Sequence, residues 1–403
     1  MSNDIKVLSF VANEMLMQVK NNLQFVKNVS GEEFAGRFTE SPKKGETIKI
    51  RKPTRYVGRD GETFSAEDYL ERTVDMVVQT TAGVDILLTN RELMFDLDNI
   101  SERVVKPAAE TLANKIDRAA LAIATAAVYN TVGTPGTVPT ALKTYNQARA
   151  KMSWEGCPPG QQSLLVTPDM QVEAVDAGKT LFNPDGEIGS QYELGIVGRH
   201  AGAKVYECQN LVINTVGPLG GTPLVNGATQ TGASLVTDGW TAAAASRLKK
   251  GNIFTIDGVY AVNPWTRETI GALRQFTVTA DASSDGSGNA TLAISPAIIT
   301  SGPFQNVTAS AADNAAITVL GTASTASPQG LRFHRDAFLF GSFDQPSPGS
   351  AVTFSKQVSD KQTGIKIRYI RDWDTTNNKQ IDRFDCVWAF GVAYPEFAAR
   401  IAS

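Results

Sequence analysis

The first pattern along the chain is an apolar line with helical spacing. Val7, Val11, Met15 and Val19 fall on one line within residues 5–27. Apolar positions that recur every three or four residues are typical of an amphipathic helix. We expect an arm helix here, and a helix that packs on its own domain fits the pattern equally well.

The following segment, residues 36–85, changes to the period of a strand. Its alternating apolar positions are Ile48, Ile50, Val74, Met76 and Val78. Such alternation between glycines and prolines predicts two strands of a long hairpin. A two-stranded hairpin is marginally stable by itself, so we expect this extended loop to lie on a neighbouring surface.

The strongest helical pattern covers residues 99–130. Its predicted apolar stripe is Val105, Ala109, Leu112, Ile116, Ala119, Ile123 and Ala127. Pro107 should kink this helix or mark its true start, because proline is tolerated in the first turn and disrupts the interior.

Strands and helices then mix, and a change of composition follows. The run "SLLVTPDMQVEAVDA" predicts a buried strand, a turn and a helix, and "GAKVYECQNLVI" predicts another strand. Residues 275–331 contain only three charged residues and several short alternating runs, which is typical of a small β-barrel or sandwich. In the tail, "IKIRYIRDWDTTNNKQIDRFDCVWAFGVAYP" predicts a hairpin that turns at Asn377 and Asn378. We expect this tail to complete the sheet beneath the long helix.

Composition restricts the class of protein. The chain has 403 residues, of which 42% are hydrophobic and 20% charged, values that fit a globular chain of two or three units. The apolar runs are too short to span a bilayer, and the start of the chain lacks the features of a secretory signal. A net charge of −3 disfavours a dedicated nucleic-acid binder. Three dispersed cysteines indicate neither a disulfide framework nor a metal site, and favour a reducing, cytosolic compartment.

Charge is segregated along the extended loop. Its first limb is basic, and after the Arg59–Glu62 turn the second limb is acidic. This arrangement predicts a surface that meets another molecule, although charges that only keep a loop hydrated would look the same. The candidate contact residues are Lys49, Arg51, Lys52, Arg55, Arg59, Asp60, Glu62 and Asp68.

No catalytic or metal-binding motif is present, so we expect a protein that is not an enzyme and has no cofactor or metal. The two histidines, His200 and His334, have no metal-binding spacing, and we interpret them as structural. "DWDTTNNK" begins like a calcium loop but lacks the required glycine and glutamate, so we interpret it as a hairpin turn. The acidic pair Asp185 and Glu187 gives glycoside hydrolysis no specific support. Cys157 has no neighbouring base in the sequence and is interpreted as a loop cysteine.

The order of these elements resembles the major capsid proteins of tailed bacteriophages, which have the Hong Kong phage type of α+β fold. "NISERVVKPAAETLANKIDRAAL" resembles the family's spine helix, and "LLVTPDMQ" and "GRHAGAKVYECQNL" resemble the start of its axial domain. "LKKGNIFTIDGVYAVNPWTRETIGALRQFTVTA" is similar to the β-barrel inserted in the podovirus coat subfamily.

The resemblance implies a division of the chain. It comprises an N-terminal arm at 1–35, an extended loop at 36–85, a peripheral domain at 86–135 and 363–403 with the spine helix at 99–130, an axial domain at 136–222 and 331–362, and an inserted β-barrel at 223–330.

The resemblance also implies a function. Copies of the chain would form hexamers and pentamers of an icosahedral shell around double-stranded DNA, without sequence-specific DNA binding and without a membrane. A separate scaffolding protein and a portal protein are the expected partners, with assembly in the bacterial cytoplasm and a final place in the virion.

Two alternatives stay open. An encapsulin-like nanocompartment would use the same fold to enclose enzymes, and the inserted domain argues against it. A carbohydrate-active enzyme with a β-rich module would need a cleft with paired acids.

Overall fold

The structure is a computed structural model that describes residues 2–31, 45–59, 61–64, 66–69, 71–89, 104–178, 198–242, 246–360 and 363–403. The chain forms two compact units. Unit 1 comprises Met1–Ile50, Thr73–Leu121 and Phe338–Ala393, and unit 2 comprises Arg51–Arg72, Ala122–Ala337 and Tyr394–Ser403.

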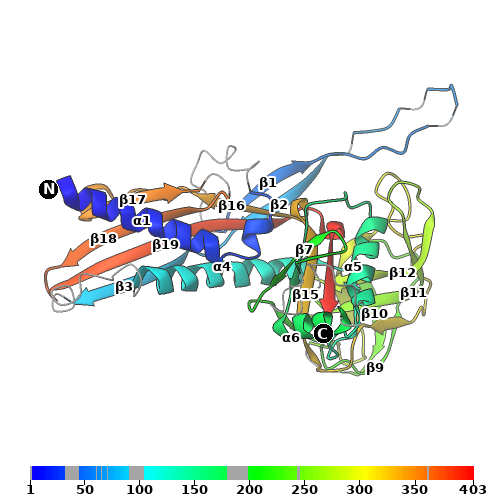
Figure 1. The fold of residues 1–403 in the computed structure, drawn as a ribbon. Helices are drawn as coiled ribbons and strands as arrows, with labels where there is room; N and C mark the ends of the chain where they lie inside the picture. Colours follow the sequence, from blue (N-terminus) through cyan, green and yellow to red (C-terminus); the bar gives the residue numbers. More distant parts are fainter. Residues whose placement is uncertain are drawn as a thin grey trace. The chain divides into compact units, whose positions relative to one another are not determined.

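Unit 1 is built on a long antiparallel sheet (Figure 1). Its strands are β1 (Thr47–Lys52), β2 (Arg72–Val78), β3 (Ala82–Thr89), β16 (Phe338–Phe343), β17 (Phe354–Ser359), β18 (Lys366–Asp374) and β19 (Lys379–Val392). The first half of β19 pairs with β3 and β18, and its second half pairs with β2 and β16. The predicted hairpin is confirmed, because β18 and β19 are joined by a turn in which Asn378 has φ of 53°.

The N-terminal helix packs on this sheet. Helix α1 (Ser2–Asn22) contacts β17 and β18, and its buried side chains include Met15, Leu16 and Val19. Lys20 Nζ lies 3.2 Å from Asp360 Oδ1 in the turn after β17. Of the two interpretations of this helix, packing on its own unit is the one that the structure shows. The short helix η1 (Val26–Asn28) follows, and η4 (Gly349–Ala351) precedes β17.

Helix α4 (Lys106–Ala127) is the predicted long helix, with Pro107 in its first turn and a π-helical turn at Val104 and Val105 directly before it. Residues 99–103 of the prediction lie outside the described residues. Val105, Leu112 and Ile116 are buried as predicted. In the second half, however, the residues with no exposed surface are Ala120, Leu121 and Ala124, and the predicted Ala119, Ile123 and Ala127 are only half-buried. Periodicity could not show which of these residues are buried, because alanines occur around the whole circumference of this half of the helix.

The described residues of unit 2 include a mixed sheet and the helices α5 and α6. The strands are β4 (Thr131–Val132), β5 (Gln162–Val166), β6 (Arg199–His200), β7 (Ala203–Glu207), β8 (Ile213–Thr215), β15 (Ala326–His334) and β20 (Ala398–Ala402). Helices α5 (Leu142–Trp154) and α6 (Pro168–Gly178) contribute to its core, with η3 (Arg335–Ala337) and η5 (Pro395–Phe397) as short connections. The predicted buried strand of the run "SLLV" is β5, whose five residues are all buried.

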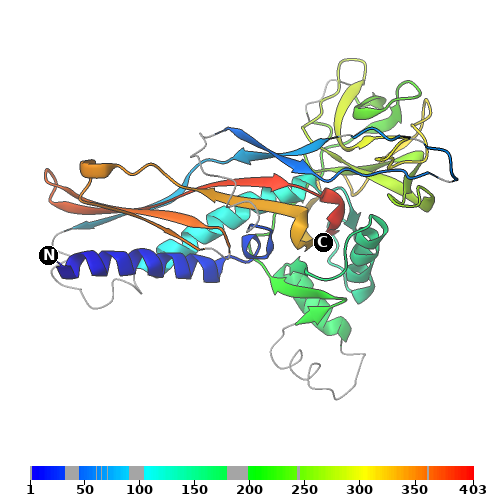
Figure 2. The ribbon, with the colours of Figure 1, turned by 90° about the horizontal axis from the view of Figure 1, so that it is seen from above.

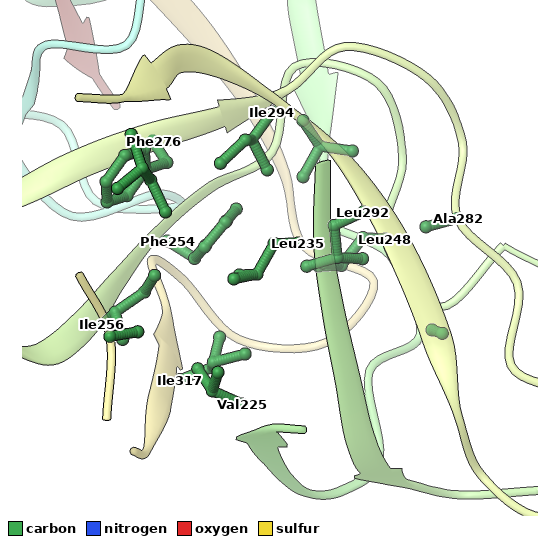
Figure 3. Close-up of a cluster of buried hydrophobic side chains, with 14 of the residues drawn as sticks. Val225, Leu235, Leu248, Phe254, Ile256, Phe276, Ala282, Leu292, Ile294 and Ile317 are labelled. Carbon is green, nitrogen blue, oxygen red and sulfur yellow. The ribbon is translucent and has the colours of Figure 1, made fainter. Parts of the chain in front are cut away.

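The predicted inserted β-barrel is confirmed and also belongs to unit 2. Its strands, in spatial order, are β14 (Ile317–Val319), β11 (Ile253–Val262), β12 (Thr269–Val278), β13 (Ala290–Ile298), β10 (Gly232–Trp240) and β9 (Gly221–Val225). A bridge between Leu224 and Ala316 brings the two edges together and nearly closes the sheet. Apolar side chains fill its interior (Figure 3), where the rings of Phe254 and Phe276 stack at 5.7 Å between centroids.

Strand pairing divides the chain differently from the expected domains. Strands β16 and β17, expected in the axial domain, pair with β19 and β18 in the sheet of unit 1. Strand β20, expected in the peripheral domain beneath the long helix, pairs instead with β15 and β4 in unit 2. The physical reason is that a strand pairs with whichever edge the folded chain brings to it, and local sequence does not record that partner.

Candidate assembly surface

The loop tip, Arg51–Arg72, is the part of the extended loop that belongs to unit 2. It contacts the inserted barrel of its own chain (Figure 2). The Arg267 guanidinium donates to the carbonyls of Tyr56 and Val57 at 3.1 and 3.4 Å. The Arg72 guanidinium lies 4.4 Å from the centre of the Phe304 ring. The loop tip is therefore partly supported before any second molecule is present.

Two of the predicted basic residues have partners near the end of the same chain. Lys52 Nζ lies 4.5 Å from the centre of the Tyr394 ring, and Arg55 Nη2 lies 3.5 Å from Glu396 Oε1. Burial lowers the pKa of Lys52 to about 8, although the Glu396 carboxylate opposes this shift. Lys52 and Arg55 therefore have partners within their own chain, which the sequence did not predict.

The other arginines of the basic limb shape the loop tip. Arg51 Nε lies 2.6 Å from Glu71 Oε1 on the acidic limb, and with the Arg51 side chain 77% exposed this pair contributes only ~0–1 kcal/mol. Arg59 Nη1 donates to the carbonyls of Gly61 and Thr63 at 2.7 and 2.8 Å, which closes the turn.

Glu67 is a further residue that shapes the tip. Its carboxylate accepts the backbone N–H groups of Val57 and Gly58 at 2.6 and 2.7 Å. Hydrogen bonds to a charged acceptor are stronger than neutral ones. The limbs of the loop tip are therefore joined through side chains, in a stretch whose described residues form no strand between Lys52 and Arg72.

The remaining candidate residues face outward. Lys49, Glu62 and Asp68 are exposed, whereas Asp60 lies outside the described residues. The loop tip also exposes aromatic side chains that charge analysis missed, namely Tyr56 at 58%, Phe64 at 85% and Tyr69 at 63%. The signal that could have found them is the occurrence of three aromatic residues in a segment without a predicted helix or buried strand.

No catalytic group stands out in the part of the chain that the structure describes. Within it, no cluster of three or more His, Cys, Asp or Glu residues could hold a metal ion. Burial raises the pKa of the Cys157 thiol to about 12, so the thiol stays protonated at neutral pH. His334 is buried and its Nδ1 accepts the N–H of Asp336 at 3.2 Å. The pair Asp185 and Glu187 lies outside the described residues.

Comparison with protein families decides the identity. The family model described as P22 coat protein, gene protein 5, matches residues 1–400. The chain belongs to this coat protein family. Its function is that of a major capsid shell protein, and the prediction of a phage capsid protein with the α+β capsid fold is confirmed. Membership of a coat protein family supports self-association and a place in the virion.

Similar solved structures also come from phages. The coat protein is similar to a structure from Mycobacterium phage Che8, with 12% identity, coverage of 94% of this chain and 90% of that chain, and a TM-score of 0.47. It is also similar to the mature capsid of bacteriophage PhiM1, with 11% identity, coverage of 89% of this chain and 82% of that chain, and a TM-score of 0.43. The capsid of cyanophage P-SCSP1u has 11% identity, coverage of 91% of this chain and 85% of that chain, and a TM-score of 0.43. These likenesses are distant, and the assignment rests on the family match.

None of the curated proteins matches the coat protein. Among the described residues, no helix is long and apolar enough to cross a bilayer.

Proposed function

We propose that this coat protein assembles as hexamers and pentamers into an icosahedral shell that encloses double-stranded phage DNA. The family match over residues 1–400 carries the proposal. Assembly takes place in the bacterial cytoplasm with a separate scaffolding protein and a portal protein, and the protein has no catalytic activity. Shell contacts of this kind are heterologous contacts that close on themselves.

The loop tip supplies a contact of suitable chemistry. Its exposed residues combine charges of both signs (Arg59, Glu62 and Asp68) with the exposed rings of Phe64 and Tyr69. Burial of a Phe side chain contributes roughly 1.5–3 kcal/mol, whereas each exposed ion pair contributes ~0–1 kcal/mol. The aromatic side chains therefore supply most of the affinity for a neighbouring copy, and the charges set the register.

The net charge of −3 suits a wall that encloses DNA without binding it tightly. A strongly basic inner surface would hold DNA through release of counterions, and that would hinder release of the genome.

The test is assembly of the full chain with a co-expressed scaffolding protein, followed by electron microscopy and sedimentation. Phe64→Ser should lower the yield of shells several-fold. Adding Glu62→Gln and Asp68→Asn to Phe64→Ser should lower the yield further. The melting temperature of the unassembled subunit should stay within about 1–2 °C, because substitutions of exposed residues change the unfolding free energy by only ~0.5 kcal/mol or less.

Val172→Ser is the matched control, because Val172 is an exposed apolar residue (67%) on α6 and is not part of the loop tip. Shell yields that are equal for Phe64→Ser, Val172→Ser and the unmodified chain would contradict the role of the loop tip. Failure of the unmodified chain to form shells would contradict the proposed function itself.

A turnover assay with a broad set of glycans tests the competing enzyme hypothesis. We expect no hydrolysis, and catalytic turnover by the purified protein would contradict a purely structural role.

A further inference from the structure

An open groove lies in unit 2 beside the start of the inserted barrel. Its volume is about 470 Å³, within the range of roughly 300–1,000 Å³ that is usual for binding pockets. Helix α4, strand β8 and the turn before β11 line it. Their side chains in the groove include Ile123 of α4, Ile213 of β8, and Lys249 and Lys250 of the turn.

Hydrogen bonds hold the walls of this groove in place. The Thr277 hydroxyl on β12 donates to the carbonyl of Ala126 on α4 at 3.2 Å. Asn214 on β8 donates from Nδ2 to the carbonyl of Gly251 at 2.9 Å and accepts from Asn252 Nδ2 at 3.0 Å. The groove is therefore formed within a single subunit, and a preformed surface loses little conformational entropy when a partner binds.

The groove combines an apolar surface with an excess of positive charge. Ile213 is 57% exposed, and Lys249, Lys250 and Asp281 are exposed around it. Asp281 Oδ1 accepts the backbone N–H of Lys250 at 2.7 Å. Two ammonium groups against one carboxylate leave the groove with a net positive charge. Such a surface fits an apolar side chain that is flanked by carboxylates.

The loop tip has this combination. Phe64 is 85% exposed, and Glu62 and Asp68 lie two positions before it and four positions after it, both of them exposed. Between Tyr56 and Tyr69 the sequence has one arginine and four acids. The charge of the loop tip is therefore opposite to that of the groove.

The loop tip of the same chain is held at a different place. Arg267, which donates to the carbonyls of Tyr56 and Val57, lies in the turn between β11 and β12. Lys249 and Lys250 precede β11 at its other end. Since β11 has ten residues, its two ends are on the order of 30 Å apart.

The loop tip is also too short to span that distance. Phe64 is three residues from Glu67, whose carboxylate accepts the Val57 N–H, so Phe64 extends at most about 11 Å beyond this connection. None of the residues that line the groove belongs to the loop tip. As Arg267 holds it, the loop tip therefore leaves the groove of its own chain open.

We propose that this groove receives the loop tip of a second copy of the chain. Phe64 of one copy packs against Ile213 of the other, and the carboxylates of Glu62 and Asp68 lie beside the two lysines. Because the loop tip and the groove are different surfaces of one subunit, the contact is heterologous and can close into a ring. The inference rests on the proposed function and adds the surface that receives the loop tip.

Exchange of charges tests the pairing in the assembly measurement described above. Lys249→Glu with Lys250→Glu should lower the yield of shells at least fivefold, and Glu62→Lys with Asp68→Lys should do the same. All four substitutions together should restore at least half of the yield of the unmodified chain. Absence of this recovery would overturn the groove as the receiving surface. Failure of the unmodified chain to form shells would instead contradict the proposed function.

Lys143→Glu with Lys204→Glu is the matched control, because both are exposed lysines of unit 2, on α5 and β7, that do not line the groove. This pair should keep the yield of shells within twofold of that of the unmodified chain. The melting temperature of the unassembled subunit should stay within about 1–2 °C for each pair of substitutions. An equal loss of shells in the control would mean that net charge decides the yield, and would overturn the proposal.

Cross-linking gives a measurement that does not depend on the charge-reversal variants. Chains with Asp68→Cys and chains with Lys250→Cys are assembled together and treated with a short bis-maleimide. Covalent dimers should be several-fold more abundant in the mixed shells than in shells of either variant alone, which give the background from the native cysteines. Equal amounts of dimer in all three preparations would overturn the proposed contact.

Discussion

Asp117 shows how one residue fixes a segment far from it in the sequence. Its carboxylate, 1% exposed on α4, accepts the backbone N–H groups of Gln24, Phe25 and Val26 at 2.7, 3.2 and 3.1 Å. These donors lie where α1 has ended and η1 begins, so Asp117 satisfies N–H groups that would otherwise be buried without partners. Burial raises the pKa of Asp117 to about 6, and the three N–H donors oppose this shift.

Asp117→Asn should destabilise the subunit by about 1–3 kcal/mol, because an amide NH₂ would then face buried N–H donors. Urea unfolding measures the change. Glu110→Gln is the matched control, an exposed acid on the same helix, and it should change the free energy of unfolding by less than ~0.5 kcal/mol. Equal effects of both substitutions would contradict the role of Asp117.

The unmodified chain and the Asp117→Asn variant should also differ in how their free energy of unfolding depends on pH. Because the pKa of Asp117 is higher in the folded chain than the ordinary value of 3.8, the folded state holds this proton more tightly. The resulting stabilisation is complete below about pH 4 and is lost as the pH rises through about 6. The stability advantage of the unmodified chain over Asp117→Asn should therefore shrink between pH 4 and 7. A stability advantage that grows between pH 4 and 7 would mean that the pKa of Asp117 is lowered in the folded chain, not raised.

At the scale of elements, the inserted barrel is stabilised by its own core. Strand β10 shows the alternation clearly, with Leu235 fully buried among the side chains of Figure 3 and Val236 41% exposed. Strands β10 to β13 have nine or ten residues each, longer than the short alternating runs seen in the sequence.

Leu235→Ala should lower the free energy of unfolding by about 2–5 kcal/mol, through lost burial and the cavity left behind. Val236→Ala on the opposite face of the strand should cost less than ~1 kcal/mol. Calorimetry of the two variants measures the difference. Similar melting temperatures would mean that β10 does not have the orientation described.

Local patterns predicted elements well where one face or one turn decides the outcome. The run "SLLV" is the buried strand β5, and Asn378 adopts the left-handed conformation that a tight hairpin turn requires. The residues of the proposed contact were harder to predict. Charge indicated Lys52 and Arg55, and both have partners within their own chain, while the rings of Phe64 and Tyr69 are exposed. Exposure depends on what packs nearby, and sequence spacing does not record it.

At the scale of the whole molecule, the proposed contact between copies should depend on ionic strength. Raising the salt from about 0.1 M to about 1 M shortens the screening length from roughly 10 to 3 Å. The yield of shells from the unmodified chain should fall, since Arg59, Glu62 and Asp68 of the loop tip are exposed and easily screened.

Light scattering against salt concentration measures this dependence. In the variant Glu62→Gln with Asp68→Asn the dependence should be weaker, because two of the charges are absent. Identical salt dependence in the variant would place the electrostatic contact elsewhere on the surface.

The sequence by itself determined the local elements of this protein: the two long helices, the turns, the charge-poor insert and the segregated charge of the extended loop. These follow from interactions between residues a few positions apart, which spacing and residue type record. Only the tertiary structure decided that β20 joins β4 and β15, and that Asp117 holds the segment after α1. Those outcomes depend on residues far apart in the sequence, such as Gln329 and Ala402 or Phe25 and Asp117, and burial there is set by the whole fold.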